Sequence, residues 1–339
     1  MNPEKVKKVG LIQGGLGAER EVSLMSSQSV AKAFNELGIL YKILEADENI
    51  AKNLSNLKPD CVFLAVHGKY AEDGVLQGIC EYLKIPYTGS GVLVSALCMD
   101  KCFFKDYISQ RGIPTPNYQN LNLKDHSLQE LILKNLSFLS RDTSSDIIEG
   151  SSALPSDKNS KKNPLSFPLV VKPSREGSSL GINVCKNKQE WSLALRKALQ
   201  YDQKILVESY IEGMELAVSF LNDQVLTPVE IVPGEGFYDY KSKYQSKKTQ
   251  YILPPRLDKK IIAKCKTLVY QVVNILPIGT YCRVDFIIKD NITPLITEVN
   301  TLPGLTTHSL LPKSAQLDGI DFNTLILTIL KGACLDYQR

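Results

Sequence analysis

The sequence predicts an α/β and α+β fold, in which a parallel sheet covered by helices is followed by smaller mixed sheets. Two observations carry this prediction. In the first hundred residues, short apolar runs alternate with segments of helical periodicity, the pattern of βαβ units. Further along, strand-like runs follow one another with fewer helices between them, which is typical of mixed sheets. A chain of 339 residues has room for roughly two or three domains.

The N-terminal region combines buried strands with one long helix. The helix is expected over about 19–37, because apolar residues recur on one of its faces and Gly38 can end it. Ligands of parallel sheets collect at the carboxyl ends of the strands, where the glycine-rich loop 13–17 and His67 fall. The expected strands are 6–12, 39–44 and 61–66.

The middle of the chain is expected to form a second domain. One helix over about 91–109 is predicted to end at Gly112, and two prolines at 114 and 116 mark a connector. Residues 137–166 are rich in Ser, Lys and Asn, so they are expected to form a surface insertion. The further expected strands are 169–172, 204–208, 215–221, 225–232, 281–288 and 294–300.

Composition excludes several classes of protein. Forty Lys and Arg against thirty-six Asp and Glu give a net charge of +4, too small and dispersed to indicate a nucleic-acid or membrane partner. No apolar stretch approaches the roughly 18 residues of a membrane span, and the N-terminus runs directly into a strand, so a cytoplasmic protein is expected. Eight cysteines form no CxxC pair and lie mostly in apolar runs, which predicts buried thiols rather than zinc ligands or disulfides.

A lysine followed by a small-residue loop occupies residues 172–181. Lys172 ends a strand-like run, and the loop after it contains two glycines and three serines. Small residues let backbone N–H groups approach an anion, and the lysine adds a point charge. The segment lacks the Walker pattern, so a phosphate-binding loop and a flexible hairpin turn both remain open.

Acidic and amide side chains are expected to meet on one face of a C-terminal hairpin. A two-residue turn at 290–291 would place Arg283 opposite Glu298, with Asp285 and Asn300 on the same face. Two carboxylates and an amide oxygen suit Mg²⁺, which prefers oxygen ligands. The alternative is a solvated face with an ion pair, which the strongly apolar flanking residues disfavour.

Two further segments are candidates for a ligand site. Segment 298–310 leads from a strand through a Pro-Gly turn to an expected helix start, where N–H groups could hold an oxyanion, although a capped turn is the simpler interpretation. His308 alone indicates no catalytic role. Segment 234–251 combines glycines, tyrosines and lysines without periodicity, which favours a lid over a linker.

Taken in order, these segments resemble the D-alanine–D-alanine ligases of the ATP-grasp superfamily. The resemblance covers nearly the whole chain and rests on residues 14–26, 67–78, 86–101, 170–182, 234–251, 283–286 and 298–310. It implies a three-domain ATP-grasp fold with an N-terminal Rossmann-like parallel sheet domain. The implied domains are 1–100, then 101–213 with the insertion at 137–166, and finally 214–339 with the lid loop at 234–251.

The resemblance also implies an activity. Such a ligase joins two D-alanines into D-alanyl-D-alanine for peptidoglycan precursors, through an acyl phosphate and with release of ADP and phosphate. The implied ligands are ATP, D-alanine and two Mg²⁺ ions, for which Mn²⁺ can substitute. The implied assembly is a homodimer.

Roles are implied for residues that match the family's motifs. Glu19 resembles the carboxylate that holds the ammonium group of the first D-alanine, with Ser178 and Tyr244 connecting it to the phosphate loop and the lid. Asp285, Glu298 and Asn300 match the metal ligands, and Arg283 and the N–H of Gly304 match the oxyanion contacts. Lys243, Ser309 and the N–H of Leu310 resemble the site for the second D-alanine. The implied nucleotide contacts are Lys101, Lys172, Ser179, Glu208, Ile211 and Glu215.

A few positions depart from the family pattern, and alternatives remain. Gly17 stands where serine is expected, and Tyr210 replaces an indole. A D-alanine–D-lactate ligase is the sibling alternative, although Tyr244 favours an amine nucleophile. A dinucleotide-dependent oxidoreductase is disfavoured because Arg20 stands where the GxGxxG fingerprint needs its third glycine. A non-catalytic nucleotide sensor is the remaining class.

Overall fold

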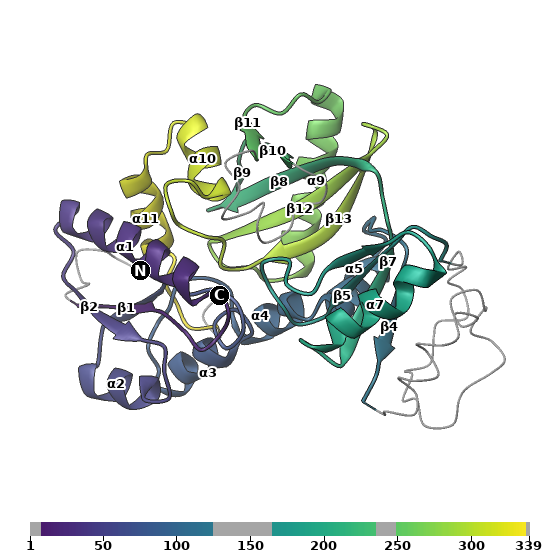
Figure 1. Cartoon of the computed structure of the whole chain (residues 1–339). Helices are drawn as coiled ribbons and strands as arrows, with labels where there is room; N and C mark the ends of the chain where they lie inside the picture. The colour runs from purple at the N-terminus through teal and green to yellow at the C-terminus, as the bar shows by residue number, and fades with distance from the viewer. Residues whose placement is uncertain (1–7, 125–164, 235–248, 337–339) are drawn as a thin grey trace. The chain divides into compact units, whose positions relative to one another are not determined.

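The computed structural model describes residues 8–124, 165–234 and 249–336, and it contains three sheets with associated helices (Figure 1). One sheet is parallel and two are antiparallel, so the predicted combination of α/β and α+β architecture is confirmed. Among the described residues, no helix combines the length and hydropathy needed to cross a bilayer.

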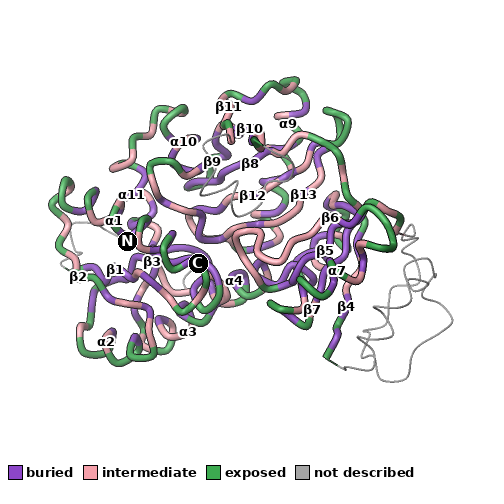
Figure 2. Tube along the Cα trace, viewed as in Figure 1, coloured by how far each residue is buried: buried purple, intermediate pink, exposed green. Residues whose placement is uncertain are grey.

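The N-terminal sheet is parallel, with strand order β2-β1-β3. Its core is a continuous apolar cluster that also takes in side chains of helices near the C-terminus, and most of the sheet is buried (Figure 2). The expected strands and the long helix are therefore confirmed to within a few residues. The elements are β1 (Val9–Gln13), α1 (Arg20–Glu36), β2 (Tyr41–Glu45), α2 (Ile50–Leu57), β3 (Cys61–Leu64) and α3 (Val75–Tyr82).

A second sheet runs in the order β11-β10-β8-β12-β13, with β9 paired to β8. Alternate residues of β12 are buried against α4 (Val92–Met99), α5 (Lys101–Ser109) and α9, whereas the residues between them face the other way. One face therefore packs and the opposite face is available for chemistry. The expected strand over 225–232 is two shorter strands. The elements are β8 (Gly213–Leu221), β9 (Gln224–Val225), β10 (Val229–Val232), β11 (Gln250–Ile252), α9 (Lys259–Ile275), β12 (Tyr281–Lys289), β13 (Thr293–Asn300), α10 (Leu310–Leu317) and α11 (Phe322–Lys331).

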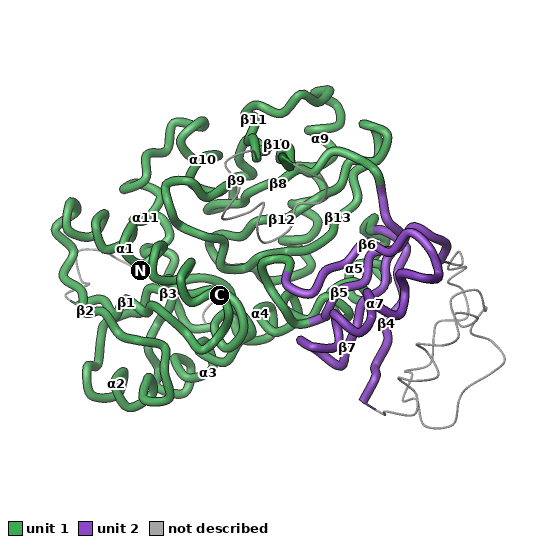
Figure 3. The backbone as a smooth tube through the Cα atoms, viewed as in Figure 1, with its two compact units in different colours: residues 1–115, 175–179, 212–339 green, residues 116–174, 180–211 purple. Residues whose placement is uncertain are grey.

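The chain divides into two compact units (Figure 3). The larger unit takes its described residues from 1–115, 175–179 and 212–339, and the smaller from 116–174 and 180–211. The smaller unit is an antiparallel sheet in the order β4-β7-β5-β6, with α7 packed on it through Trp191 and its neighbours. Its elements are β4 (Tyr118–Asn122), β5 (Leu169–Pro173), β6 (Asn183–Cys185), α7 (Lys188–Leu199) and β7 (Lys204–Ser209).

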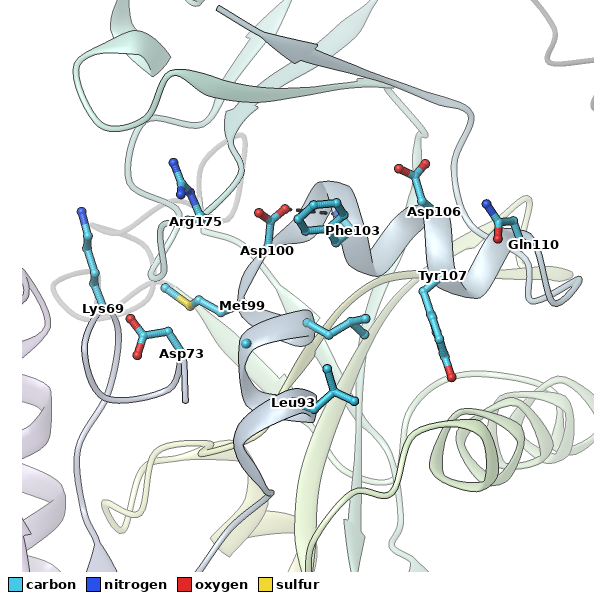
Figure 4. Close-up of a pocket in the computed structure, with 12 residues that line it drawn as sticks. Lys69, Asp73, Leu93, Met99, Asp100, Phe103, Asp106, Tyr107, Gln110 and Arg175 are labelled. Carbon is cyan, nitrogen blue, oxygen red and sulfur yellow. Dashed lines mark hydrogen bonds between the residues drawn. The ribbon is translucent and has the colours of Figure 1, made fainter. Parts of the chain in front are cut away.

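The helix expected over 91–109 is two helices, α4 (Val92–Met99) and α5 (Lys101–Ser109). Asp100 breaks them, because its backbone is extended, with φ −86° and ψ 94°, and its carboxylate accepts a hydrogen bond from the N–H of Phe103 at 3.2 Å (Figure 4). Aspartate is a strong N-cap, and periodicity alone does not reveal a cap inside a continuous apolar stripe. The break makes Lys101 the first residue of α5.

Replacing Asp100 by alanine should lower the free energy of unfolding by about 1 kcal/mol, because the first turn of α5 loses its cap. The same change should reduce the activity that the sequence motifs imply, since α5 carries Lys101 at its start. Thermal unfolding measures the first effect, and the rate of phosphate release measures the second. Asp321 caps α11 in the same way, through the N–H of Thr324 at 2.8 Å, so Asp321→Ala is the matched control. Equal activity in the two variants would contradict a functional role for the break.

All eight cysteines are free thiols, and all but Cys334 are buried, as the sequence predicted. Burial raises the pKa of the Cys61 and Cys80 thiols to about 12. Neutral, inaccessible thiols of this kind act as small apolar side chains.

Candidate active site

The acidic ribbon formed by β12 and β13 is present, but its register differs from the predicted one. Asp285 lies directly opposite Glu298, and Arg283 lies opposite Asn300. The prediction that Arg283 would face Glu298 is therefore wrong. The prediction that all four side chains share one face of the ribbon is confirmed, because directly opposed residues project to the same side.

Two departures from a regular hairpin cancel each other. The turn is one residue longer than predicted, because the ladder pairs Lys289 with Thr293. A β-bulge then adds Thr297 as an extra residue between the two halves of the ladder, and its hydroxyl donates to the carbonyl of Asp285 at 3.0 Å. Either shift alone would turn Glu298 to the opposite face, whereas the two together return it to the face of Asp285.

The four side chains form a partly exposed group that contains one guanidinium, two carboxylates and one amide. Arg283 holds Asp285 with two hydrogen bonds, at 2.7 Å from Nε and 2.8 Å from the terminal nitrogen. The side chain of Glu298 is 30% exposed, and the amide oxygen of Asn300 accepts from the N–H of Leu302 at 3.1 Å. Oxygen donors that solvent can reach suit a hard cation such as Mg²⁺. Within the described ranges, no group of three or more His, Cys, Asp or Glu side chains offers a competing site.

Lys101 connects this ribbon with the small-residue loop. Its Nζ lies 3.6 Å from the Glu298 carboxylate and donates to the carbonyl of Glu176 at 2.6 Å. The side chain is 8% exposed, so its charge is poorly screened by water. Residues 175–179 of the loop belong to the larger unit, and the structure thus brings the loop and the acidic ribbon to the same lysine.

Glu19 lies at the start of α1, and its carboxylate accepts a hydrogen bond from the Ser178 hydroxyl. The side chain is buried, and two glycines make room for it. A Cβ atom at Gly68 would lie 2.6 Å from a Glu19 oxygen, and one at Gly177 would lie 2.7 Å from it. The close approach of both backbones explains why glycine is needed at these two positions. The sequence-based pairing of Glu19 with Ser178 is therefore present.

The turn that follows β13 leads into α10, as predicted. The Ser309 hydroxyl accepts from the N–H of Thr306 at 3.1 Å and contacts the Thr306 hydroxyl at 2.8 Å. A Cβ atom at Gly304 would lie 2.9 Å from this hydroxyl, so Gly304 and Ser309 are adjacent. Leu310 is the first residue of α10. The N–H groups in the first turn of a helix have no carbonyl acceptor within the helix. His308 is exposed and takes no part in this cluster.

His67 holds the turn against the N-terminal sheet, a contact the sequence did not reveal. Its Nδ1 lies 2.9 Å from the carbonyl of Leu302 and its Nε2 lies 2.8 Å from the Ser26 hydroxyl. That hydroxyl also accepts from the N–H of Leu305 at 3.3 Å. Burial by itself lowers the pKa of His67, but the hydrogen bond and charge of Glu72 outweigh it and raise the pKa. The one sequence feature that could have indicated this role is the position of His67 directly after a buried strand.

Glu215 lies on the same face of the second sheet as the acidic ribbon. It stands opposite Ile287, which is two residues along β12 from Asp285. Because side chains two residues apart share a face, Glu215, Asp285 and Arg283 all project to one side. The predicted ribose contact and the predicted metal ligands therefore share a surface.

The smaller unit contains three other predicted nucleotide contacts. Lys172 is the next-to-last residue of β5 and forms a buried ion pair with Glu208 on the neighbouring strand β7. Ile211 follows this strand and is half-buried, beside the exposed Tyr210. Removing either partner would leave an uncompensated charge buried in this sheet.

Some predicted residues lie outside the described ranges. These are Tyr244 and Lys243, most of the lid loop 234–251, and nearly all of the insertion 137–166.

A cavity of about 650 Å³ beside α4 and α5 is lined by Asp73, Asp100, Phe103, Arg175 and other residues (Figure 4). No predicted site residue lines it, so it is separate from the acidic ribbon.

Comparisons with known proteins show the family to which the chain belongs. Family models described as the N-terminus and the C-terminus of D-ala D-ala ligase match residues 41–90 and 148–331. A D-alanine–D-alanine ligase of Geotalea uraniireducens is 38% identical over 335 residues, which cover 99% of this chain and 98% of that relative. One of Carboxydothermus hydrogenoformans is 38% identical, with 95% of this chain and 97% of the relative covered.

A solved structure points the same way. The crystal structure of D-alanine–D-alanine ligase from Bacillus anthracis has a TM-score of 0.75 and 32% identity, with 96% of each chain covered. The family and fold expected from the sequence motifs are confirmed. The chain belongs to the D-alanine–D-alanine ligase family.

Proposed function

We propose that this protein joins two D-alanines into D-alanyl-D-alanine at the expense of ATP, in the cytoplasm and for peptidoglycan precursors. The carboxylate of the first D-alanine attacks the γ-phosphorus of ATP, and ADP leaves. The amine of the second D-alanine then attacks the acyl phosphate, loses a proton, and phosphate leaves. The observation that carries the proposal is the single face on which Asp285, Glu298 and Asn300 lie, with Lys101 beside Glu298.

The triphosphate and its ions are assigned to oxygen ligands and lysines. Asp285, Glu298 and Asn300 would hold two Mg²⁺ ions, or Mn²⁺ in their place. When bound, the ions neutralise phosphate charge and orient the transferring group. Lys101 and Lys172 bind phosphate oxygens, with Ser179 on the loop. Glu208 and Ile211 bind the adenine, and Glu215 binds the ribose.

The two amino acids are assigned to separate groups. Glu19 holds the ammonium of the first D-alanine, and Ser178 and Tyr244 link it to the loop and the lid. Arg283 and the N–H of Gly304 stabilise the oxyanion that forms when the second amine attacks. Lys243, Ser309 and the N–H of Leu310 bind the carboxylate of the second D-alanine. Such assignments leave little covalent chemistry to the protein, whose task is positioning and charge stabilisation.

The proposed organisation has three domains, 1–100, 101–213 and 214–339, and the chain is proposed to act as a homodimer. Supporting this division, each range is dominated by a sheet of its own. Analytical ultracentrifugation measures the assembly directly, and a monomer at the concentration used for assays would exclude the dimer.

Incubation with ATP, Mg²⁺ and D-alanine tests the activity. The expected result is stoichiometric release of phosphate and formation of D-alanyl-D-alanine. Phosphate release with a different carboxylate and amine, but none with D-alanine, would overturn the proposed substrate. Competition by D-lactate at neutral pH would identify a depsipeptide-forming enzyme instead.

Glu19→Gln should raise the KM for the first D-alanine by tenfold or more, since a hydrogen bond between charged groups contributes roughly 1.5–3 kcal/mol. The maximal rate should change less, because the reacting phosphate and carbonyl are held by other residues. Initial rates at varied D-alanine measure both constants. Glu21→Gln is the matched control, because Glu21 is an exposed carboxylate two residues along α1. A KM equal to that of the control would remove Glu19 from the substrate site.

A further inference from the structure

A fully buried lysine lies beneath the acidic ribbon. Lys105 on α5 has no exposed surface, and its ammonium group bonds the Thr115 hydroxyl and donates to the carbonyl of Ile296 at 3.1 Å. The Thr115 hydroxyl donates to the same carbonyl at 2.8 Å. One backbone carbonyl of β13 thus receives two side-chain donors.

Such a lysine is costly to bury. Lysines are almost never fully buried, and desolvating an ammonium group costs several kcal/mol before its contacts offset the loss. An apolar side chain could fill the same space within the surrounding core without that penalty. Lys105 is therefore expected to have a function that depends on its charge or its hydrogen bonds.

The carbonyl that Lys105 holds lies at a sensitive point of the ribbon. β13 is the edge strand of its sheet among the described strands, and Ile296 directly precedes Thr297, the extra residue of the bulge. On its outer side, the N–H of Ile296 donates to the carbonyl of Pro114 at 2.9 Å. Ile296 is the last regularly paired residue before the bulge. Its backbone is thus held by hydrogen bonds to residues outside the two strands of the ribbon.

Helix α5 contacts β13 at two points that match in spacing. Lys101 lies 3.6 Å from the Glu298 carboxylate, and Lys105, one turn later, bonds Ile296, two residues earlier on the strand. Four residues of helix rise by roughly 6 Å, and two residues of strand span roughly 6.6 Å. The two lysines therefore clamp the segment that contains the bulge.

We propose that Lys105 is a positioning residue for the metal ligands: it fixes the β13 bulge, and through the bulge it keeps Glu298 aimed to the same side as Asp285. The inference rests on the proposed function of that ribbon as the metal site. Loss of the ammonium group frees the Ile296 carbonyl from one of its two donors and loosens the bulge, so that Glu298 no longer holds one orientation.

Mn²⁺ binding in the presence of a non-hydrolysable ATP analogue tests the proposal, with electron paramagnetic resonance as the readout. Lys105→Met replaces the lysine by an uncharged side chain of similar length. The expected result is a loss of Mn²⁺ affinity of roughly tenfold or more, because small misplacements of ligands have large effects. The maximal rate of phosphate release should fall in parallel.

Lys266 provides the matched control. It also donates from a helix to a backbone carbonyl of the same sheet, that of Val225 at 3.1 Å, but on the short strand β9. Lys266→Met should leave Mn²⁺ affinity unchanged. Thr115→Val removes the second donor to the Ile296 carbonyl and should weaken Mn²⁺ binding severalfold. Thr115→Ser keeps the hydroxyl donor and should bind Mn²⁺ with wild-type affinity.

The outcomes separate the inference from the proposed function. Wild-type Mn²⁺ affinity in Lys105→Met overturns the inference alone, whatever the melting temperature. If Lys105→Met does not fold, the Thr115 pair decides: equal Mn²⁺ affinity in Thr115→Val and Thr115→Ser overturns it. A wild-type protein that releases phosphate with D-alanine but binds no Mn²⁺ with the analogue overturns both the inference and the metal site.

Discussion

Replacing Glu298 by glutamine is expected to lower the rate of phosphate release by at least about 10²-fold. The amide removes one of the two carboxylate charges that would hold divalent ions, and it also removes the negative charge that lies 3.6 Å from the Lys101 ammonium. Loss of even an outer partner of a metal ligand typically costs 10–100-fold, so loss of a ligand should cost more. Rates at several Mg²⁺ concentrations measure the effect.

Asp290→Asn is the matched control for that substitution. Asp290 lies at the exposed tip of the same ribbon with φ +52°, a left-handed conformation that asparagine also tolerates. The control therefore makes the same change from carboxylate to amide away from the proposed ligands, and it should retain wild-type activity. Glu298→Gln should unfold at nearly the wild-type temperature, because the side chain is partly exposed. Normal turnover by Glu298→Gln would remove Glu298 from the proposed metal site.

Replacing Arg283 by lysine should lower the maximal rate by roughly 10²–10³-fold, the effect of losing one oxyanion donor. Arg283 holds Asp285 with two hydrogen bonds in a planar fork, which a lysine cannot reproduce. The substitution should therefore disturb both the oxyanion contact and the orientation of a proposed metal ligand.

The two effects can be separated by the dependence on metal. If Arg283 acts on the oxyanion, saturating Mg²⁺ leaves most of the defect of Arg283→Lys in place. If it acts only by orienting Asp285, high Mg²⁺ restores the rate. Initial rates over a range of Mg²⁺, at saturating ATP and D-alanine, distinguish these results, and full recovery would contradict the oxyanion role.

Much of the site could be predicted because its residues follow local rules. Alternation along a strand places Arg283 with Asp285 and Glu298 with Asn300, and small residues mark the loop beside Glu19. The register could not be predicted in the same way, because alternation along each strand determines neither the length of the turn nor the extra residue Thr297 in the bulge. A register shift of one residue would turn Glu298 to the opposite face, whereas the two shifts that are present leave it on the face of Asp285.

Other features depend on residues far apart in the chain. Asp100 caps α5 within a stripe that reads as one helix, so the break is invisible to periodicity. His67 meets the carbonyl of Leu302 across 235 positions of sequence, and Lys105 meets that of Ile296 across 191. A single sequence gives the identity of such residues without their partners, and so their roles emerge only from the fold.

Transfer of isotopic oxygen tests the account most directly. D-alanine labelled with ¹⁸O in its carboxylate is incubated with the protein, ATP and Mg²⁺, and the released phosphate is analysed by mass spectrometry. The account predicts ADP together with phosphate that carries one ¹⁸O atom, because the carboxylate oxygen that attacks the γ-phosphorus leaves with it. Unlabelled phosphate, or AMP in place of ADP, would contradict it.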